Sequence, residues 1–238
     1  MSRWALKRLL LLGLCALLAL LFAGLGVWQV ERLQWKLDLI ARIDARLAAV
    51  PTPAPGRAEW DRLAARDAEY RRVFAVGRFD HGRETLVDAL TERGPGFWVV
   101  TPLRTETSTI LVNRGFIPPG RKSPERRSAG QASGTVRITG LLRLTEPGGR
   151  ILRPNQVAAD RWYSRDVAAI AGKRGVRDAL PYFIDADATD NPGGLPLGGL
   201  TVVHFRNAHL VYALTWFGLA ALSLFGLALV WKTAHKQG

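Results

Sequence analysis

Two long uncharged, apolar runs constrain this chain more than any other feature of its sequence. Leu9–Val30 is 22 residues long, and Asn207–Trp231 is 25 residues long. A bilayer hydrocarbon core of about 30 Å needs about 20 apolar residues of helix at about 1.5 Å per residue. Each run therefore predicts a transmembrane helix, and residues 31–206 form one domain between the two spans.

The first run could instead be a signal that is removed. The apolar region of a cleaved signal peptide usually spans only about 7 to 15 residues before a small-residue cleavage site. Leu9–Val30 is longer, and no convincing site of that kind follows it. A lipoprotein anchor on Cys15 is excluded because the bulky Leu14 directly precedes the cysteine. We therefore expect the run to stay as an anchor.

Basic residues flank both runs on their outer sides and predict the orientation. Arg3, Lys7 and Arg8 precede the first run, and Lys232 and Lys236 follow the second. Because cytoplasmic flanks carry the excess of Lys and Arg, tails 1–8 and 232–238 should be cytoplasmic and domain 31–206 extracytoplasmic. No Ser- and Arg-rich presequence precedes the first run, which favours a bacterial plasma membrane.

Charge and cysteine content exclude several function classes. Five of the 33 lysines and arginines flank the runs on their outer sides. The other 28, together with all 20 acidic residues, belong to the middle of the chain. A moderately basic domain outside the cytoplasm is not expected to meet nucleic acid. The single cysteine, Cys15, excludes an internal disulfide, a cysteine-based zinc site and a dithiol redox motif.

The middle of the chain begins as helix and then becomes rich in β-strand signals. Glu31–Leu47 has apolar residues at helical spacing, and the prolines of 51–55 end that helix. A short helix follows at Glu59–Ala68. β-rich runs bounded by Gly and Pro predict strands. The predicted strands are Tyr70–Phe79, Thr85–Leu90, Phe97–Leu103, Thr109–Asn113 and Thr135–Leu144.

These strands are short, and the last one alternates apolar and polar residues. We therefore predict an α+β domain, mainly an antiparallel sheet or small barrel. Ser164-Arg165-Asp166 predicts the start of a helix over Val167–Lys173, and Thr201–Phe205 predicts a final strand. Residues 115–130 are expected to form an exposed basic loop, with contact to anionic headgroups or an acidic partner as the alternative. Gly115 is expected in a turn with positive φ.

His209 is the residue with the most promising chemistry. It begins the second apolar run, and the offsets of three and seven place Tyr212 and Trp216 on its helical face. A neutral imidazole can bind iron, and an aromatic wall suits a flat macrocycle. A histidine that only forms an interfacial hydrogen bond is the alternative. His81 is predicted to lie in a turn, and His204 is predicted to lie at the end of a strand.

No enzyme is predicted. The sequence contains no recognisable pair of nucleophile and base, and residues 185–190 lack the glycine and the closing glutamate of a calcium loop.

Several segments in order along the chain together resemble one family, the Surfeit locus protein 1 (Shy-type) family. Asn113-Arg114-Gly115 within Leu111–Pro118 and the start of the second run are the most specific matches. The matching segments are Gly26–Arg32, Gly77–Phe79, Gly94–Leu103, Leu111–Pro118, Gly140, Asn155, Trp162-Tyr163, Pro181–Asp185 and Arg206–Gly218.

The resemblance implies an assembly factor for haem-copper cytochrome c oxidase. Such a protein would bind haem a, with other haems left open, and assist its insertion into subunit I, with haem a synthase as a further partner. The resemblance makes His209 the suspected iron ligand, with Tyr212 and Trp216 beside it. Arg206 or Arg114 could pair with the haem propionates. A scaffold that stabilises subunit I without touching haem is the alternative.

Overall fold

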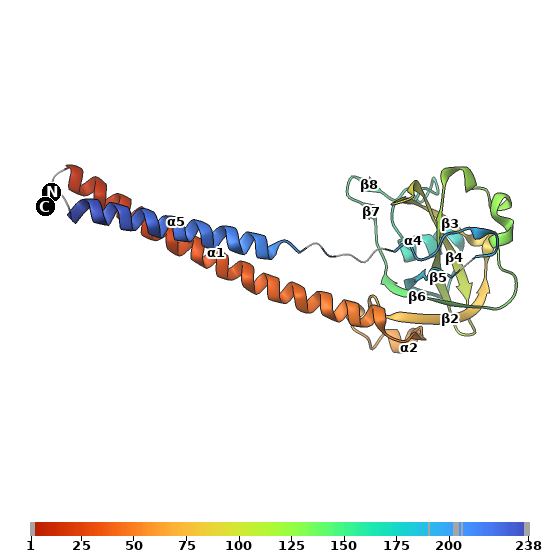
Figure 1. Ribbon diagram of the computed structural model, residues 1–238. Helices are drawn as coiled ribbons and strands as arrows, with labels where there is room; N and C mark the ends of the chain where they lie inside the picture. The colour runs from red at the N-terminus through yellow and green to blue at the C-terminus, as the bar shows by residue number, and fades with distance from the viewer. Residues whose placement is uncertain (1–2, 190, 202–204, 206, 236–238) are drawn as a thin grey trace. The chain divides into compact units, whose positions relative to one another are not determined.

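The computed structural model describes residues 3–189, 191–201, 205 and 207–235, and the chain divides into two compact units (Figure 1). We call residues 1–42 with 204–238 the helical unit, and residues 43–203 the barrel unit.

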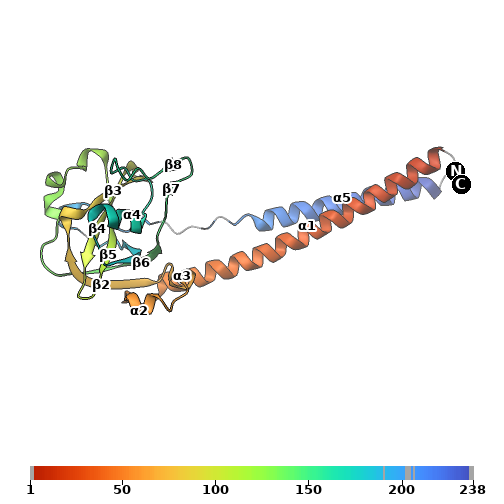
Figure 2. The ribbon, with the colours of Figure 1, turned by 180° about the vertical axis from the view of Figure 1, so that it is seen from behind.

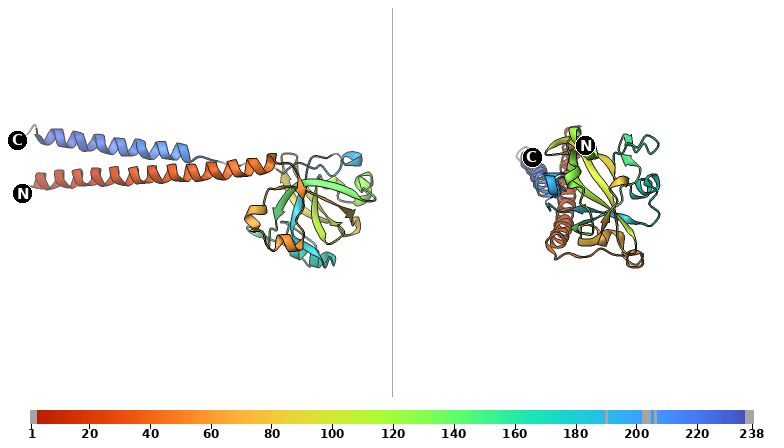
Figure 3. Two further views of the ribbon diagram at one scale, coloured as in Figure 1. Left: turned by 90° about the horizontal axis from the view of Figure 1, so that it is seen from below. Right: turned by 90° about the vertical axis from the view of Figure 1, so that its right-hand side faces the viewer.

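Two long helices lie in the helical unit, except for residues 43–48 at the end of the first. Helix α1 spans Arg3–Ala48 without a break, so the predicted amphipathic stretch continues the first apolar run as one helix. Helix α5 spans His209–His235. The two helices run side by side in opposite directions (Figures 2 and 3). By length and composition both could cross a membrane, and most of their side chains are exposed rather than packed in a protein core.

The barrel unit contains one seven-stranded sheet, in the order β1-β2-β6-β9-β5-β4-β3. An additional pairing of β2 with β4 closes the strands β2, β6, β9, β5 and β4 into a barrel. The strands are β1 Thr52–Pro53, β2 Arg72–Phe79, β3 Thr85–Thr91, β4 Gly94–Arg104, β5 Thr109–Ile117, β6 Val136–Leu144 and β9 Ala179–Ala186. Pairs β1–β2 and β5–β9 are parallel and the rest are antiparallel, which confirms a small, mainly antiparallel barrel.

Short elements surround the barrel. They are helices α2 Arg57–Trp60, α3 Ala65–Ala68 and α4 Val167–Arg174, 3-10 turns η1 His81–Arg83, η2 Pro119–Arg121, η3 Pro124–Gly130 and η4 Pro192–Gly194, and the hairpin of β7 Gly149–Arg150 with β8 Arg153–Pro154. The predicted start of α4 is confirmed, because the Asp166 carboxylate accepts the Ala169 N–H as an N-cap.

The prediction of a single helix over Glu59–Ala68 is wrong, because the backbone at Ala64 is extended and divides the segment into α2 and α3. The predicted final strand, Thr201–Phe205, includes residues 202–204, which lie outside the described residues; Thr201 and Phe205 are in no regular element.

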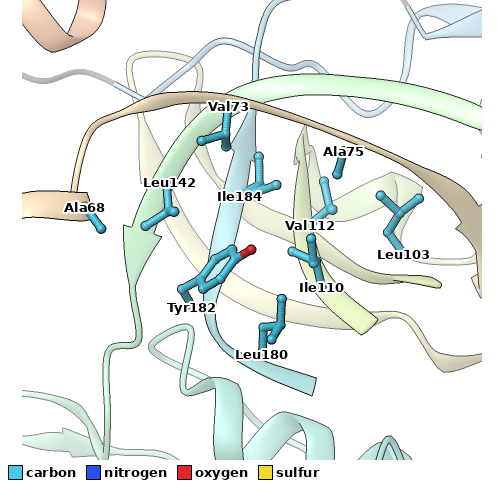
Figure 4. Packing of buried hydrophobic residues seen from close by; sticks show 10 residues of the cluster. All are labelled: Ala68, Val73, Ala75, Leu103, Ile110, Val112, Leu142, Leu180, Tyr182 and Ile184. Carbon is cyan, nitrogen blue, oxygen red and sulfur yellow. The ribbon is translucent and has the colours of Figure 1, made fainter. Parts of the chain in front are cut away.

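Apolar side chains from opposite walls of the barrel meet in its interior (Figure 4). The cluster consists of Ala68, Val73, Ala75, Leu103, Ile110, Val112, Leu142, Leu180, Tyr182 and Ile184. The Tyr182 hydroxyl lies in this apolar core and donates to the Pro55 carbonyl at 2.7 Å. Burial raises the pKa of this phenol. The interior is therefore a packed core rather than a ligand cavity.

Strand β5 carries a bulge at the motif Asn113-Arg114-Gly115. Asn113 pairs with Val100 and Phe116 with Trp98, so two residues of β5 face the single Val99 of β4. Gly115 has φ +130°, which confirms the expected positive φ, but it lies in a strand bulge rather than a turn. An added Cβ would overlap the Leu197 carbonyl group.

The expected exposed loop at 115–130 is only partly correct. Residues 115–117 belong to β5, and η2 and η3 occupy much of the remainder. Arg127 is buried, and its guanidinium pairs with the Glu84 carboxylate. The exposed cations of this segment are Arg121, Lys122 and Arg126.

Candidate functional site

Small residues allow the two helices of the helical unit to pack closely. Ala19 of α1 and Ala213 and Ala220 of α5 are buried. Gly26 of α1 lies against the ring of Phe217, which an added Cβ would overlap. Small residues at a helix–helix contact let the backbones approach each other, as in membrane helix pairs.

His209 is the first residue of α5, and two side chains hold it. Its backbone N–H donates to Asn207 Oδ1 at 3.3 Å, which satisfies one of the free donors at the start of the helix. Its ring Nδ1 lies 2.8 Å from Oε1 of Gln29 on α1. Because an amide oxygen only accepts, Nδ1 of the imidazole carries the hydrogen. Among the described residues, nothing hydrogen-bonds to Nε2.

The two aromatic residues predicted beside His209 differ in their surroundings. Trp216 stacks on Phe22 of α1, with ring centroids 5.6 Å apart and planes inclined by 24°. Tyr212 is 55% exposed. His209 and Trp216 therefore share the face of α5 that packs on α1, while Tyr212 borders that face.

The structure does not test the two predicted propionate partners of a haem at His209. Arg206, like the comparison residue His204, lies outside the described residues. Arg114 belongs to the barrel unit, where it is buried and donates to Asn191 Oδ1 at 3.3 Å and to the Gly130 carbonyl. Burial lowers its pKa to about 10. Arg114 is thus engaged in contacts that hold the barrel together.

Gln29 is the residue of this site that sequence reasoning did not single out. It is only 8% exposed, although it lies in a helix whose side chains are mostly exposed. The sequence carried a signal, because Gln29 is an amide near the end of the first apolar run. Polar side chains in such runs are costly and usually have a partner or a function.

The described residues include no group of three or more His, Cys, Asp or Glu side chains that could hold a metal ion. A haem makes a smaller demand on the protein, because the porphyrin supplies four nitrogens and the chain adds only axial ligands. His209 fits that demand, because no described residue hydrogen-bonds to its Nε2, and the aromatic pair of Trp216 and Phe22 lies about two helical turns further along α5 on the same face.

A second polar cluster lies in the barrel around Asp185 of β9, whose side chain is 1% exposed. Its carboxylate accepts from Asn113 at 2.7 Å, from Arg143 at 3.1 Å and from Arg165 at 3.0 Å. Burial alone would lower the pKa of Arg165, but the charges of Asp185 and Glu146 raise it. All these groups neutralise one another, so the cluster serves the fold.

A surface groove of about 800 Å³ lies on the barrel unit between β3 and the segment before α4, and Phe97 and Lys122 contribute to its lining. Its acid Asp160 accepts from both Arg174 Nη2 at 2.8 Å and Trp162 Nε1 at 2.8 Å. These contacts occupy the Asp160 carboxylate. The groove is also lined by His81, Glu84 and Asp88.

Comparison with known proteins places the chain in a family. The family model described as "SURF1 family" matches residues 16–221. "Surfeit locus protein 1" of Rattus norvegicus is 40% identical over 215 residues, which cover 83% of this chain and 68% of the relative. The Homo sapiens protein of that name is 41% identical over 216 residues, covering 83% and 70%. A "SURF1-like protein" of Monosiga brevicollis is 38% identical over 229 residues, covering 90% and 84%.

These relatives are eukaryotic, so the expected bacterial plasma membrane remains a prediction. The family model matches the chain from within the first candidate span, across the barrel, to within the second, and the three relatives each cover 83% or more of the chain. The chain therefore belongs to the SURF1 family.

Proposed function

We propose that this chain is an assembly factor for haem-copper cytochrome c oxidase that holds haem a through His209 and assists its insertion into subunit I. Membership of the SURF1 family supports the assembly role. The observation that supports haem binding is the imidazole of His209, whose Nδ1 is held by Gln29 at 2.8 Å. That contact leaves Nε2 as the nitrogen able to act as an axial ligand.

The chain's own residues would hold the haem in a defined way. His209 would provide the axial nitrogen, and Tyr212 and Trp216 would contact the macrocycle. Arg206 would pair with a propionate, whereas the contacts of Arg114 within the barrel make it the weaker candidate. Haem a, once delivered, supplies the redox centre of the oxidase. Haem a synthase would be the donor and subunit I the acceptor.

In this proposal α1 and α5 span the bacterial plasma membrane, and the barrel unit lies on its extracytoplasmic side. Helix length, apolar composition and the basic flanks support this topology. A reporter that is active only outside the cytoplasm should work when inserted near Pro119 and be silent when fused after Gly238. The opposite pattern would show that the orientation is inverted.

The haem proposal is tested with protein purified from cells that make haem a. The full-length protein should carry a haem visible spectrum, and His209→Ala should remove most of the bound haem. Insertion should be unaffected, because alanine is a good helix former and tolerates apolar surroundings. Normal insertion of His209→Ala with unchanged haem content and spectrum would exclude His209 as the ligand and favour the scaffold role.

His204→Ala is the matched control, since it removes an imidazole close by in the sequence. It should retain haem at the wild-type level. Loss of haem from both variants would instead indicate that two histidines form the site.

A further inference from the structure

The contact between Gln29 and His209 joins residues 180 positions apart in the sequence. Gln29 is buried against α5, and its side-chain oxygen meets Nδ1 rather than Nε2 of the imidazole. A carboxamide oxygen has no hydrogen to give, so the hydrogen bond forms only when His209 donates it. The contact therefore selects between the two neutral forms of the ring.

We propose that Gln29 is a positioning residue for His209: it holds the imidazole in the Nδ1–H form and presents the lone pair of Nε2 to the haem iron. The proposal rests on the haem-binding function proposed above. Partners that accept a hydrogen bond from the far nitrogen of a metal-binding histidine fix its tautomer and ring orientation and adjust its basicity. Gln29 has the geometry of such a partner.

Because Gln29 is uncharged, it would also affect how strongly His209 binds iron. A carboxylate in the same position would give the imidazole more negative character and a stronger bond to iron. It would also place a charge in a largely apolar helix pair, which is costly. An amide orients the ring without that extra ligand strength, which suits a protein that must release its haem to another chain.

His81 of the barrel unit provides an internal contrast. Its Nε2 lies 3.0 Å from the Ala132 carbonyl oxygen, which only accepts, so this ring carries its hydrogen on Nε2. Its Nδ1 lies 3.4 Å from Nη1 of Arg114, which only donates. Both nitrogens of His81 are engaged and its tautomer is opposite to the one inferred for His209.

The first test needs no haem. Full-length protein labelled with ¹⁵N-histidine, in detergent micelles at a pH where histidine is neutral, is analysed by long-range ¹H–¹⁵N spectra that distinguish the tautomers. Comparison with His209→Ala identifies the His209 signals. We expect Nδ1–H for His209 and Nε2–H for His81 in the unaltered protein.

Three substitutions separate tautomer control from simple helix packing. Gln29→Leu removes the acceptor and should abolish the preference of His209 for Nδ1–H, whereas Gln29→Glu keeps an acceptor and should retain it. Gln34→Leu makes the same change at an exposed position of α1 and should leave the His209 signals unchanged. An Nε2–H form of His209 in the unaltered protein, or the same spectrum after Gln29→Leu, would overturn the proposal.

The second test uses protein loaded with ferrous haem a. Gln29→Leu should weaken haem affinity by about 10- to 100-fold, the usual cost of losing such a partner. The iron–histidine stretching frequency in resonance Raman spectra should fall in Gln29→Leu and rise in Gln29→Glu, and Gln34→Leu should match the unaltered protein.

The two tests distinguish the failure of each proposal. Identical stretching frequencies in all variants would overturn the role of Gln29 while leaving haem binding intact. Failure of the unaltered protein to bind haem would refute the proposed function and, with it, the ligand role assigned to the oriented nitrogen, even if the tautomer were as expected.

Discussion

The two units of this molecule differ in how completely their polar side chains are hydrogen-bonded. In the barrel unit, the buried carboxylate of Asp185 has three side-chain partners, Asn113, Arg143 and Arg165. In the helical unit, His209 is held at one ring nitrogen by Gln29, and nothing among the described residues hydrogen-bonds to the other. A buried polar group whose hydrogen bonds are all formed stabilises a fold, whereas a partly buried imidazole with one nitrogen without a partner among the described residues can still bind a ligand.

This contrast predicts that Asp185 matters for stability far more than His209. Asp185→Ala leaves the partly buried guanidiniums of Arg143 and Arg165 without their shared counter-charge and should cost about 3–5 kcal/mol of unfolding free energy. Urea unfolding of the full-length protein in detergent, followed by near-ultraviolet circular dichroism of the barrel, measures this. His209→Ala should leave the same transition within about 0.5 kcal/mol of its original value.

Asp67→Ala is the matched control in the barrel unit. The Asp67 carboxylate is 58% exposed and lies 3.7 Å from Arg46, so its removal should cost under about 1 kcal/mol. Equal losses for Asp67→Ala and Asp185→Ala would contradict the view that the buried cluster holds the barrel together.

Gly115→Ala should have the next largest effect. It places a Cβ at φ +130°, where it also overlaps the Leu197 carbonyl, and we expect a loss of about 1–3 kcal/mol in the same urea experiment. Gly134→Ala measures the cost of a positive φ without any overlap, because Gly134 has φ +84° with open space around it. An equal loss of unfolding free energy for Gly134→Ala and Gly115→Ala would contradict a contribution from the overlap with the Leu197 carbonyl.

The smallest predicted effect is a pH dependence from His81. Burial lowers its pKa, with a further lowering by the charge of Arg114 that the Ala132 hydrogen bond opposes. The unfolded chain therefore takes up a proton more readily, and stability is lost as the pH falls from about 6.5 toward the lowered pKa of the folded state.

The urea midpoint of the barrel should accordingly decline modestly between pH 7 and pH 5.5. His81→Gln retains a donor for the Ala132 carbonyl and cannot titrate, so it should flatten the decline. A decline of equal slope in His81→Gln would assign the pH dependence to groups other than His81.

Local patterns in the sequence predicted much of this fold. The five strands with β-rich runs between turn residues, the N-cap of α4 and the two long helices are all present. Strand β9 was not recognised as a strand, because it has buried residues in succession instead of alternation and contains Pro181. The register of its pairing with β5 is irregular at that point.

The partners of the candidate site were harder to predict than its central residue. His209 stands out as an ionisable residue at the edge of an apolar run. Its contact with Gln29 depends on how α5 packs against α1, and the partners of Asp185 depend on how the barrel closes. Local periodicity contains neither kind of information, because both contacts join segments far apart in the chain.

The position of β9 in the barrel also governs when the domain can fold during synthesis. Among the described residues it is the last strand of the chain, yet it lies between β6 and β5 and carries Asp185. Until β9 emerges, β5 and β6 each expose an unpaired edge, and Arg143 and Arg165 lack the carboxylate of Asp185 that they share. The barrel therefore cannot close until β9 is available, and most of this domain stays open in a growing chain until that strand has been made.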